Sequence, residues 1–294
     1  MKSLSICIPI YNFNCIGSIK ILCKQISSLK LNAEILVIDD ASDVKLNELS
    51  NFNNPFYTYE KLSKNIGRSK IRNLLVEKSR FDYILFLDGD SGIPEYFIKN
   101  YLQNIESNPN SVICGGRIHE AELKNTGKLR YNYGVKFEDT KSSERSKKPY
   151  YSFMTNNFIS PKAVLKNTPF NEELTKYGQE DTFFGYELKN NYVKIIHIDN
   201  PVFHLDLETN LEFIEKTKFN IENLILLKTK YPEFIEFSKL LTTINNYKVF
   251  RLKPIKNIAS ILSKFFEFIT KHSSNAYSFQ MFKLFYTISL NRLK

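Results

Sequence analysis

The chain is organised around the stretch Tyr83-Ile84-Leu85-Phe86-Leu87-Asp88-Gly89-Asp90. Its apolar run from Tyr83 to Leu87 predicts a strand that is buried on both faces of a parallel sheet. Asp88 and Asp90 follow that strand directly, at the carboxyl end where open α/β sheets bind ligands. Gly89 between them lets the backbone turn, so that both carboxylates can approach one point. Two hard oxygen ligands suit Mg²⁺ or Mn²⁺, and Mg²⁺ usually takes its other ligands from water and substrate phosphates.

A simpler interpretation of Asp88 and Asp90 is a turn after a strand. Acidic side chains are favoured there because they hydrogen-bond to the nearby backbone. The surrounding sequence therefore has to decide between a turn and a metal site.

Strands and helices alternate along the first half of the chain. The first predicted strand covers residues 5–10 and should end at Pro9, because proline cannot donate to a sheet. It is followed by a helix over 16–29, strands over 34–38 and 56–59, a helix over 69–79 and the strand over 82–87. This order favours a mostly parallel α/β sheet with right-handed crossovers.

The second half continues less regularly. We expect a helix over 94–107 with proline in its first turn, a strand over 111–118 and a polar, irregular surface segment over 119–149. We then expect a strand over 153–160, a short helix opened by Pro161, a helix over 182–188, a strand over 192–198 that is followed by Val202-Phe203-His204-Leu205-Asp206, and a helix over 209–231.

Side chains with useful chemistry recur just past the predicted strand ends. They are Tyr11, Asp39, Asp40, Asp88 and Asp90. Because the carboxyl ends of parallel strands meet at one edge of a sheet, we expect these side chains to converge. A nucleotide diphosphate fits such a site. Its base can stack near Tyr11 and hydrogen-bond to Asp39 or Asp40, while its phosphates bridge to a metal at Asp90.

Other enzymes with this kind of sheet fit the sequence poorly. A dinucleotide dehydrogenase needs a glycine-rich turn after the first strand, and the turn here, Ile10-Tyr11-Asn12-Phe13-Asn14, contains no glycine. The P-loop sequence is absent as well. A phospho-receiver domain is much shorter and explains neither Gln179-Glu180-Asp181 nor His204.

Bulk properties narrow the function further. The chain has 294 residues and a net charge of +10, but residues 238–294 hold ten Lys or Arg and one acid, Glu267. The remainder is nearly neutral, whereas a nucleic-acid-binding protein would more often carry a basic stripe across its folded body. Cys7, Cys15, Cys23 and Cys114 form no C-x-x-C pair, so we expect free thiols. We expect neither a secretion signal nor a membrane-spanning helix, and a cytoplasmic location.

Five motifs together resemble family 2 glycosyltransferases, the inverting, metal-dependent enzymes of the glycosyltransferase-A fold. The motifs occur in the family's order over residues 3–207, about two thirds of the chain. They are Ser5-Ile6-Cys7-Ile8-Pro9-Ile10-Tyr11-Asn12, Ile38-Asp39-Asp40-Ala41-Ser42, Asn65-Ile66-Gly67-Arg68 with Arg72-Asn73, Leu87-Asp88-Gly89-Asp90, and Glu180-Asp181. Each motif is loose alone, and the set in register is specific.

The resemblance implies a Rossmann-like nucleotide-binding sheet and a role for each matching residue. Pro9, Tyr11, Asp39 and Asp40 would bind the nucleoside, and Arg68 and Arg72 would lie near the nucleotide. Asp88 would face the ribose and the metal, Asp90 and His204 would bind Mn²⁺ or Mg²⁺, and Asp181 would be the catalytic base with Glu180 beside it. The donor would be a nucleotide-diphosphate sugar, most simply a UDP-sugar. The acceptor would be a saccharide or a lipid-linked molecule, in cell-surface polysaccharide assembly.

Each of these residues also has a plainer interpretation. Asp181 can cap the helix that follows it, His204 can be an ordinary residue at a strand end, Arg68 a solvated charge, and Tyr11 a packing residue in its loop. Ala41 stands where many relatives carry glycine. We expect little effect, although a left-handed backbone there would be disfavoured.

The basic C-terminal region predicts amphipathic helices. Apolar residues fall at helical spacing over 255–270, and a similar pattern covers 279–293. Basic helices rich in Phe and Leu suit an anionic membrane surface, which would place the enzyme on the inner face of the cell membrane. The alternative is packing against the protein itself. We therefore expect a catalytic domain over 1–207 and a mostly helical region over 208–294.

The function predicted from the sequence is a glycosyltransferase. Its rival is an inactive family member that binds nucleotide or glycan as an interaction module. The intact set Asp88, Asp90, Asp181 and His204 argues against that rival. The sequence carries no readable code for the sugar or the acceptor.

Overall fold

The computed structural model describes residues 3–120, 128–175, 177–247 and 253–290. The chain divides into two compact units. The first comprises Met1–Ile118, Thr140–Thr175 and Glu180–Asp206, and the second comprises His119–Asp139, Lys176–Gln179 and Leu207–Lys294.

The first unit is built on a seven-stranded sheet in the order β3-β2-β1-β4-β8-β6-β9. The strands are β1 Leu4–Ile10, β2 Ala33–Asp39, β3 Tyr57–Lys61, β4 Tyr83–Leu87, β6 Val112–Cys114, β8 Asn157–Pro161 and β9 Ile195–His197. Neighbouring strands run parallel except on both sides of β8, which is antiparallel to β4 and to β6. The expected mixed, mostly parallel sheet is confirmed.

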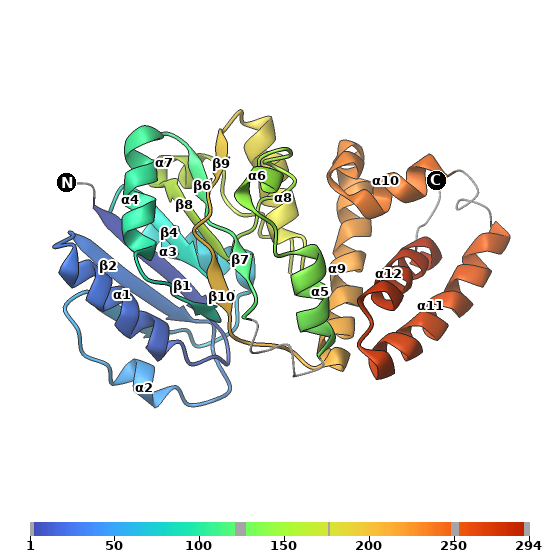
Figure 1. Ribbon diagram of the computed structural model, residues 1–294, viewed down its shortest axis with the longest axis horizontal. Helices are drawn as coiled ribbons and strands as arrows, with labels where there is room; N and C mark the ends of the chain where they lie inside the picture. The colour runs from blue at the N-terminus through green and yellow to red at the C-terminus, as the bar shows by residue number, and fades with distance from the viewer. Residues whose placement is uncertain (1–2, 121–127, 176, 248–252, 291–294) are drawn as a thin grey trace. The chain divides into compact units, whose positions relative to one another are not determined.

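Helices cover both faces of this sheet (Figure 1). One face packs against α1 Ile16–Ser28 and α4 Phe97–Ser107. The other packs against α3 Arg68–Lys78, α7 Lys162–Asn167 and α8 Glu180–Asn190. The first unit also contains the single-turn helices α2 Asn47–Ser50 and α6 Ser142–Arg145.

The side chains of each strand alternate between the two faces of the sheet. In β4, Leu85 and Leu87 belong to the core on the α1 side, whereas Phe86 belongs to the core on the α3 side. Because successive side chains of a strand point to opposite faces, Asp88 emerges from β4 on the face that α3 and α8 cover.

A second, three-stranded sheet has the order β5-β10-β7, with β5 Ser91–Gly92, β7 Arg117–Ile118 and β10 Val202–His204. The prediction of one strand over 111–118 is wrong, because β6 and β7 lie in different sheets. The break falls at Gly115 and Gly116, where Gly116 adopts a left-handed φ of 88° that glycine tolerates.

Three further predictions need correction. Strand β1 continues through Pro9 because β4 pairs with β1 only as far as Cys7, so Pro9 borders no second ladder on that side. Helix α4 begins at Phe97, after a left-handed Tyr96, and not near Pro94.

The expectation of an irregular surface segment over 119–149 is also wrong in part, because α5 Leu129–Phe137 and α6 lie within it. Arg145 of α6 is buried and donates to the carbonyl oxygens of Gly115 and Ile198. Residues 121–127 lie outside the described residues.

The second unit is helical. It contains α5 Leu129–Phe137, α9 Asn210–Lys230, the 3-10 helix η2 Pro232–Phe237, α10 Lys239–Asn246, α11 Lys253–Ser273 and α12 Ala276–Leu290. A capping box between Thr209 and Glu212 starts α9. One core cluster joins α5, α9 and α12 through Leu129, Ile214, Phe279 and Phe282. No helix in the described ranges is long and apolar enough to cross a membrane.

Candidate active site

The site begins at the carboxyl end of β4, where Asp88, Gly89 and Asp90 follow the strand. Gly89 is needed for close approach, because a Cβ at this position would lie 2.8 Å from Cγ2 of Ile10 at the end of β1. Its backbone is not left-handed, so the missing side chain, not a special turn, is what the site requires. The Asp-Gly-Asp segment is thereby held against the neighbouring strand.

Asp90 lies beside His204, the last residue of β10. The pairing of β10 with β5 sets His204 opposite Ser91, and Nε2 of His204 lies 3.0 Å from Oδ2 of Asp90. Burial tends to raise the pKa of Asp90, but the hydrogen bond and charge of His204, with Arg117 and Arg68, lower the pKa below its ordinary value. A carboxylate and an imidazole separated by 114 residues thus form one polar pair.

Asp88 is paired with Arg72 from α3. Nη2 of Arg72 donates to Oδ1 of Asp88 at 2.8 Å, and the guanidinium lies over the ring of Phe170 at 5.6 Å. Arg72 is buried, so this ion pair is shielded from solvent on the arginine side. Arg68 begins the same helix one turn earlier, and its charge acts on Asp90.

Asp40 holds the loop that leads into α3. Its two carboxylate oxygens accept from the backbone amides of Ile66 and Gly67 at 2.7 and 2.9 Å. Asp40 therefore fixes the start of the helix that carries both arginines. The next residue, Ala41, adopts the left-handed φ of 62° that the sequence made unfavourable. Such a conformation costs an alanine roughly 1–2 kcal/mol.

Asp39 and Tyr11 lie at the ends of β2 and β1. Asp39 is fully buried, and its carboxylate accepts from the Ser42 amide at 2.7 Å and from the Tyr59 hydroxyl at 2.8 Å. A carboxylate has about four lone-pair sites, so two remain. Tyr11 is half exposed and donates to Asp43 at 2.7 Å. Pro9 pairs with Ile38 inside the sheet.

Glu180 and Asp181 form the first turn of α8. Burial, together with the negative charge of Glu180, raises the pKa of Asp181 to about 6, and the positive charge of Arg72 opposes this shift. The charge of Asp88 also acts on Asp181, so α8 brings this acid to the site formed by α3 and β4. Oε1 of buried Glu180 has no hydrogen-bond partner among the described residues.

Two residues at this site were not predicted from the sequence. Phe170 packs against the Arg72 guanidinium. Asn156 lies next to Asp88, since the Asp88 amide donates to the Asn156 carbonyl at 3.1 Å. The only available signal for Asn156 was its place within the strand predicted over 153–160. Nothing local says that this strand pairs with β4.

The described residues contain no group of three or more His, Cys, Asp or Glu side chains that could hold a metal ion. All four cysteines are buried free thiols, as expected. Asp90 and His204 are a pair of potential cation ligands that the structure brings within 3.0 Å of each other at this site.

A comparison with protein families gives a match over residues 5–170, more than half of the chain, to the model described as glycosyl transferase family 2. The chain belongs to glycosyl transferase family 2. Family membership covers β1 to the Phe170 that packs on Arg72, and therefore includes most of the site described above. This is the family that the sequence predicted.

A comparison with known protein sequences also finds a relative of this chain. Chondroitin synthase from Escherichia coli is 24% identical over 221 residues, which cover 64% of this chain and 32% of the relative. The chain thus spans about a third of that protein's length.

Crystal structures of S. aureus TarS 1–349 share the fold. The complex with UDP has a TM-score of 0.57 at 17% identity, and the complex with UDP-GlcNAc has a TM-score of 0.56 at 18% identity. Each covers 98% of this chain and 90% of the TarS chain. The glycosyltransferase-A fold predicted from the sequence is confirmed.

Proposed function

We propose that this glycosyltransferase moves a sugar from a nucleotide-diphosphate donor to an acceptor hydroxyl with inversion, and that Asp181 is the base. The observation that carries the proposal is the group of charged side chains at one sheet edge. Asp90 with His204, and Asp88 with Arg72, lie beside a carboxyl group whose pKa is raised to about 6. A positioned base with such a pKa is ionised at neutral pH and can still accept a proton.

Asp90 and His204 fit a divalent cation. Their polar atoms lie 3.0 Å apart, and two protein ligands leave room for water and phosphate oxygens, as Mg²⁺ usually requires. Mn²⁺ accepts the same carboxylate and phosphate oxygens. When bound, the cation would supply positive charge against the leaving diphosphate.

The chain's own residues supply the rest of the chemistry. Asp181 takes the proton of the acceptor hydroxyl as that oxygen attacks the anomeric carbon and the bond to the diphosphate breaks. The transition state has oxocarbenium character. Arg72 holds Asp88 in place and adds positive charge near the nucleotide. One base suffices for a single displacement, which needs no covalent intermediate and inverts the anomeric centre.

UDP is the nucleotide that we propose. The TarS structures were solved with UDP and with UDP-GlcNAc, and Tyr11 and Asp39 offer an aromatic face and a carboxylate for a base. The relation to chondroitin synthase favours a saccharide acceptor, and a lipid-linked saccharide is equally compatible with the chemistry.

The test is calorimetric titration of UDP, with and without Mn²⁺, into the wild-type protein and the Asp90→Ala variant. We expect binding that requires both Mn²⁺ and Asp90. Equal binding without metal, or by the variant, would contradict the metal site. Donor hydrolysis by the wild type separates a catalyst from an inactive member that only binds nucleotide or glycan.

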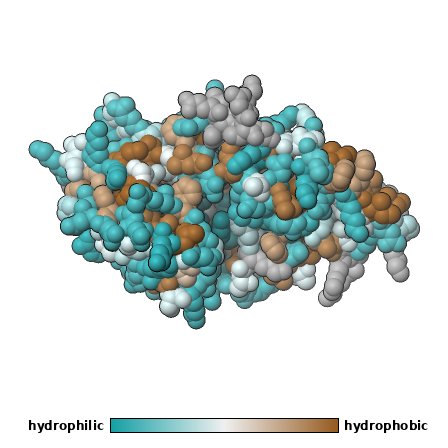
Figure 2. All heavy atoms as spheres, turned by 90° about the horizontal axis from the view of Figure 1, so that it is seen from below, coloured by the Kyte–Doolittle hydropathy of each residue, from teal (hydrophilic) through white to brown (hydrophobic). Residues whose placement is uncertain are grey.

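We further propose that α11 attaches the protein to an anionic membrane surface from the cytoplasmic side. Ile258, Ile261, Phe265 and Phe268 lie at helical spacing and are 51–70% exposed. Figure 2 shows apolar side chains, drawn in brown, that are exposed at the right-hand edge of the view. Lys264 and Lys271 are exposed on the same helix.

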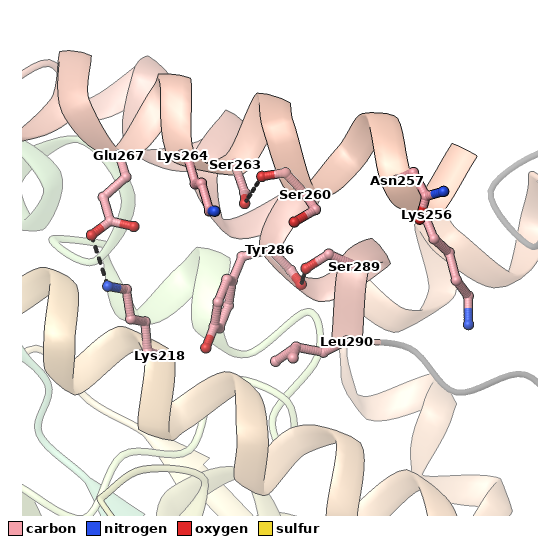
Figure 3. A pocket seen from close by; sticks show the side chains of 10 residues that line it. All are labelled: Lys218, Lys256, Asn257, Ser260, Ser263, Lys264, Glu267, Tyr286, Ser289 and Leu290. Carbon is pink, nitrogen blue, oxygen red and sulfur yellow. Dashed lines mark hydrogen bonds and ion pairs between the residues drawn. The ribbon is translucent and has the colours of Figure 1, made fainter. Parts of the chain in front are cut away.

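A cavity of about 850 Å³ in the second unit, lined by lysines and serines among other residues, supports this proposal. Lys256, Lys264 and several serines line it, and Lys218 pairs there with Glu267 at 2.7 Å (Figure 3). Lysines beside an apolar stripe favour anionic lipid by about 1 kcal/mol each.

Sedimentation with phosphatidylserine vesicles tests the membrane proposal. The variant Phe265→Asp/Phe268→Asp should lose most of its vesicle binding. Leu226→Asp is the matched control, since Leu226 on α9 is 54% exposed, as Phe265 is. Equal binding by the wild type and the double variant would contradict the proposal.

A further inference from the structure

Asn156 carries an unexplained polar group inside the first unit. The residue is only 6% exposed, yet neither its amide nitrogen nor its amide oxygen has a hydrogen-bond partner in the part of the chain that the structure describes. Buried side-chain amides are almost always paired. An unpaired amide at this depth therefore needs a partner from outside the protein.

The neighbouring residue shows what a structural asparagine looks like at this position. The Asn157 amide nitrogen donates to the carbonyl oxygens of Gly116 and Asn200 at 2.9 and 2.8 Å, and its amide oxygen accepts from the Tyr101 hydroxyl at 2.6 Å. The fold thus pairs the Asn157 side chain and leaves the Asn156 side-chain amide without a partner among the described residues.

Strand register aims Asn156 at the active site. Asn157 pairs with Leu87 across the antiparallel β4–β8 ladder, so Asn156 stands opposite Asp88. Side chains of directly opposed residues project from the same face of a sheet. Asn156 therefore lies on the face of Asp88, Arg72 and α8.

The helices that cover that face also hold buried polar atoms without a partner among the described residues. Nε of Arg72 on α3 and Oε1 of Glu180 on α8 are two of them. Unpaired donor and acceptor atoms therefore come from the segment before β8, from α3 and from α8. These segments also carry or adjoin the side chains that we propose for catalysis. A ligand that matches them must offer several hydroxyl groups, each of which donates and accepts.

We propose that Asn156 binds ring substituents of the transferred sugar, and so helps to select the donor sugar. This inference rests on the proposed function. The side-chain amide offers one donor and one acceptor, which suits a pair of neighbouring hydroxyls or an acetamido group. The nucleotide itself is recognised elsewhere, at the ends of β1 and β2.

The test compares the variant Asn156→Leu with the wild type. Calorimetry with Mn²⁺ gives the Kd for UDP and for the best-bound member of a panel of UDP-glucose, UDP-galactose, UDP-N-acetylglucosamine and UDP-glucuronic acid. We expect the Kd for UDP to stay within about 2-fold and the Kd for the UDP-sugar to rise ~10-fold, since a hydrogen bond of typical strength is lost. The Kd values for the four UDP-sugars should lie closer together in the variant than in the wild type.

Thermal unfolding separates binding from structure. Leucine is similar in size and removes an unpaired buried amide, so Asn156→Leu should melt no lower than the wild type. Asn157→Leu is the control and should melt lower, because it strips partners from Tyr101, Gly116 and Asn200.

Two results would overturn the inference alone, namely an unchanged Kd for the UDP-sugar or an equal loss for UDP and UDP-sugar. Failure of the wild type to bind UDP or any UDP-sugar would overturn the proposed function, and this inference with it.

Discussion

At the scale of single residues, the proposed acid–base chemistry depends on the burial of Asp181 and on the charges near it. Burial and the Glu180 charge raise the pKa of Asp181 to about 6. A base must be ionised, so kcat/KM should rise with pH up to about 6 and then level. Glu180→Gln removes the like charge, which should lower the pKa of Asp181 and move the rising limb to lower pH. Asp181→Asn should cost ~10²–10⁴-fold in kcat. A flat wild-type profile between about pH 5 and 7 would contradict this assignment.

The raised pKa of Asp181 also predicts that the Asp181→Asn variant is more stable than the wild type at neutral pH. Asp181 has its ordinary pKa of 3.8 in the unfolded chain and a pKa of about 6 in the fold. The unfolded state therefore releases its proton first as pH rises, and folding stability falls between about pH 4 and 6. Above that range the cost persists, so Asp181→Asn should unfold at higher temperature than the wild type at pH 7.5. At pH 3.5, where both states are protonated, the gain should disappear.

At the scale of elements, the start of α3 depends on one carboxylate in another loop. Asp40 accepts the amides of Ile66 and Gly67, and Asp40→Ala would leave both without their acceptor. We expect a loss of roughly 1–3 kcal/mol in the free energy of unfolding, with weaker UDP binding because α3 carries Arg72. Denaturant titration measures the first and calorimetry the second. Asp43→Ala, on the exposed part of the same loop, should change stability by less than about 0.5 kcal/mol. Equal stability of the two variants would contradict the role of Asp40.

At the scale of the whole molecule, the two C-terminal helices bury their aromatic side chains to different extents. Phe282 of α12 is fully buried in the cluster with Leu129 and Ile214, whereas Phe265 of α11 is 54% exposed. Phe282→Ala should cost roughly 3–5 kcal/mol and, below its melting temperature, bind vesicles like the wild type. Phe265→Ala should keep its melting temperature and bind vesicles more weakly. The reverse pattern would contradict the division between a core helix and a surface helix. The apolar patterns over 255–270 and 279–293 are alike in the sequence, so the sequence does not reveal this difference in burial.

The sequence by itself determined the elements of the sheet and the places of the polar side chains that follow β1, β2 and β4. The alternation of apolar and polar residues, helical spacing and turn residues are local signals. They can therefore be interpreted without knowledge of the fold. Five motifs in order were enough for the family. The tertiary structure alone decided that β8 runs antiparallel beside β4, that β10 brings His204 to Asp90, and that α12 buries Phe282 while α11 leaves Phe265 exposed. Those outcomes depend on strand register and on which apolar faces meet across long stretches of chain. The periodicity of one segment does not specify which other segment it pairs with. The sequence therefore did not predict that Asn156 lies beside Asp88.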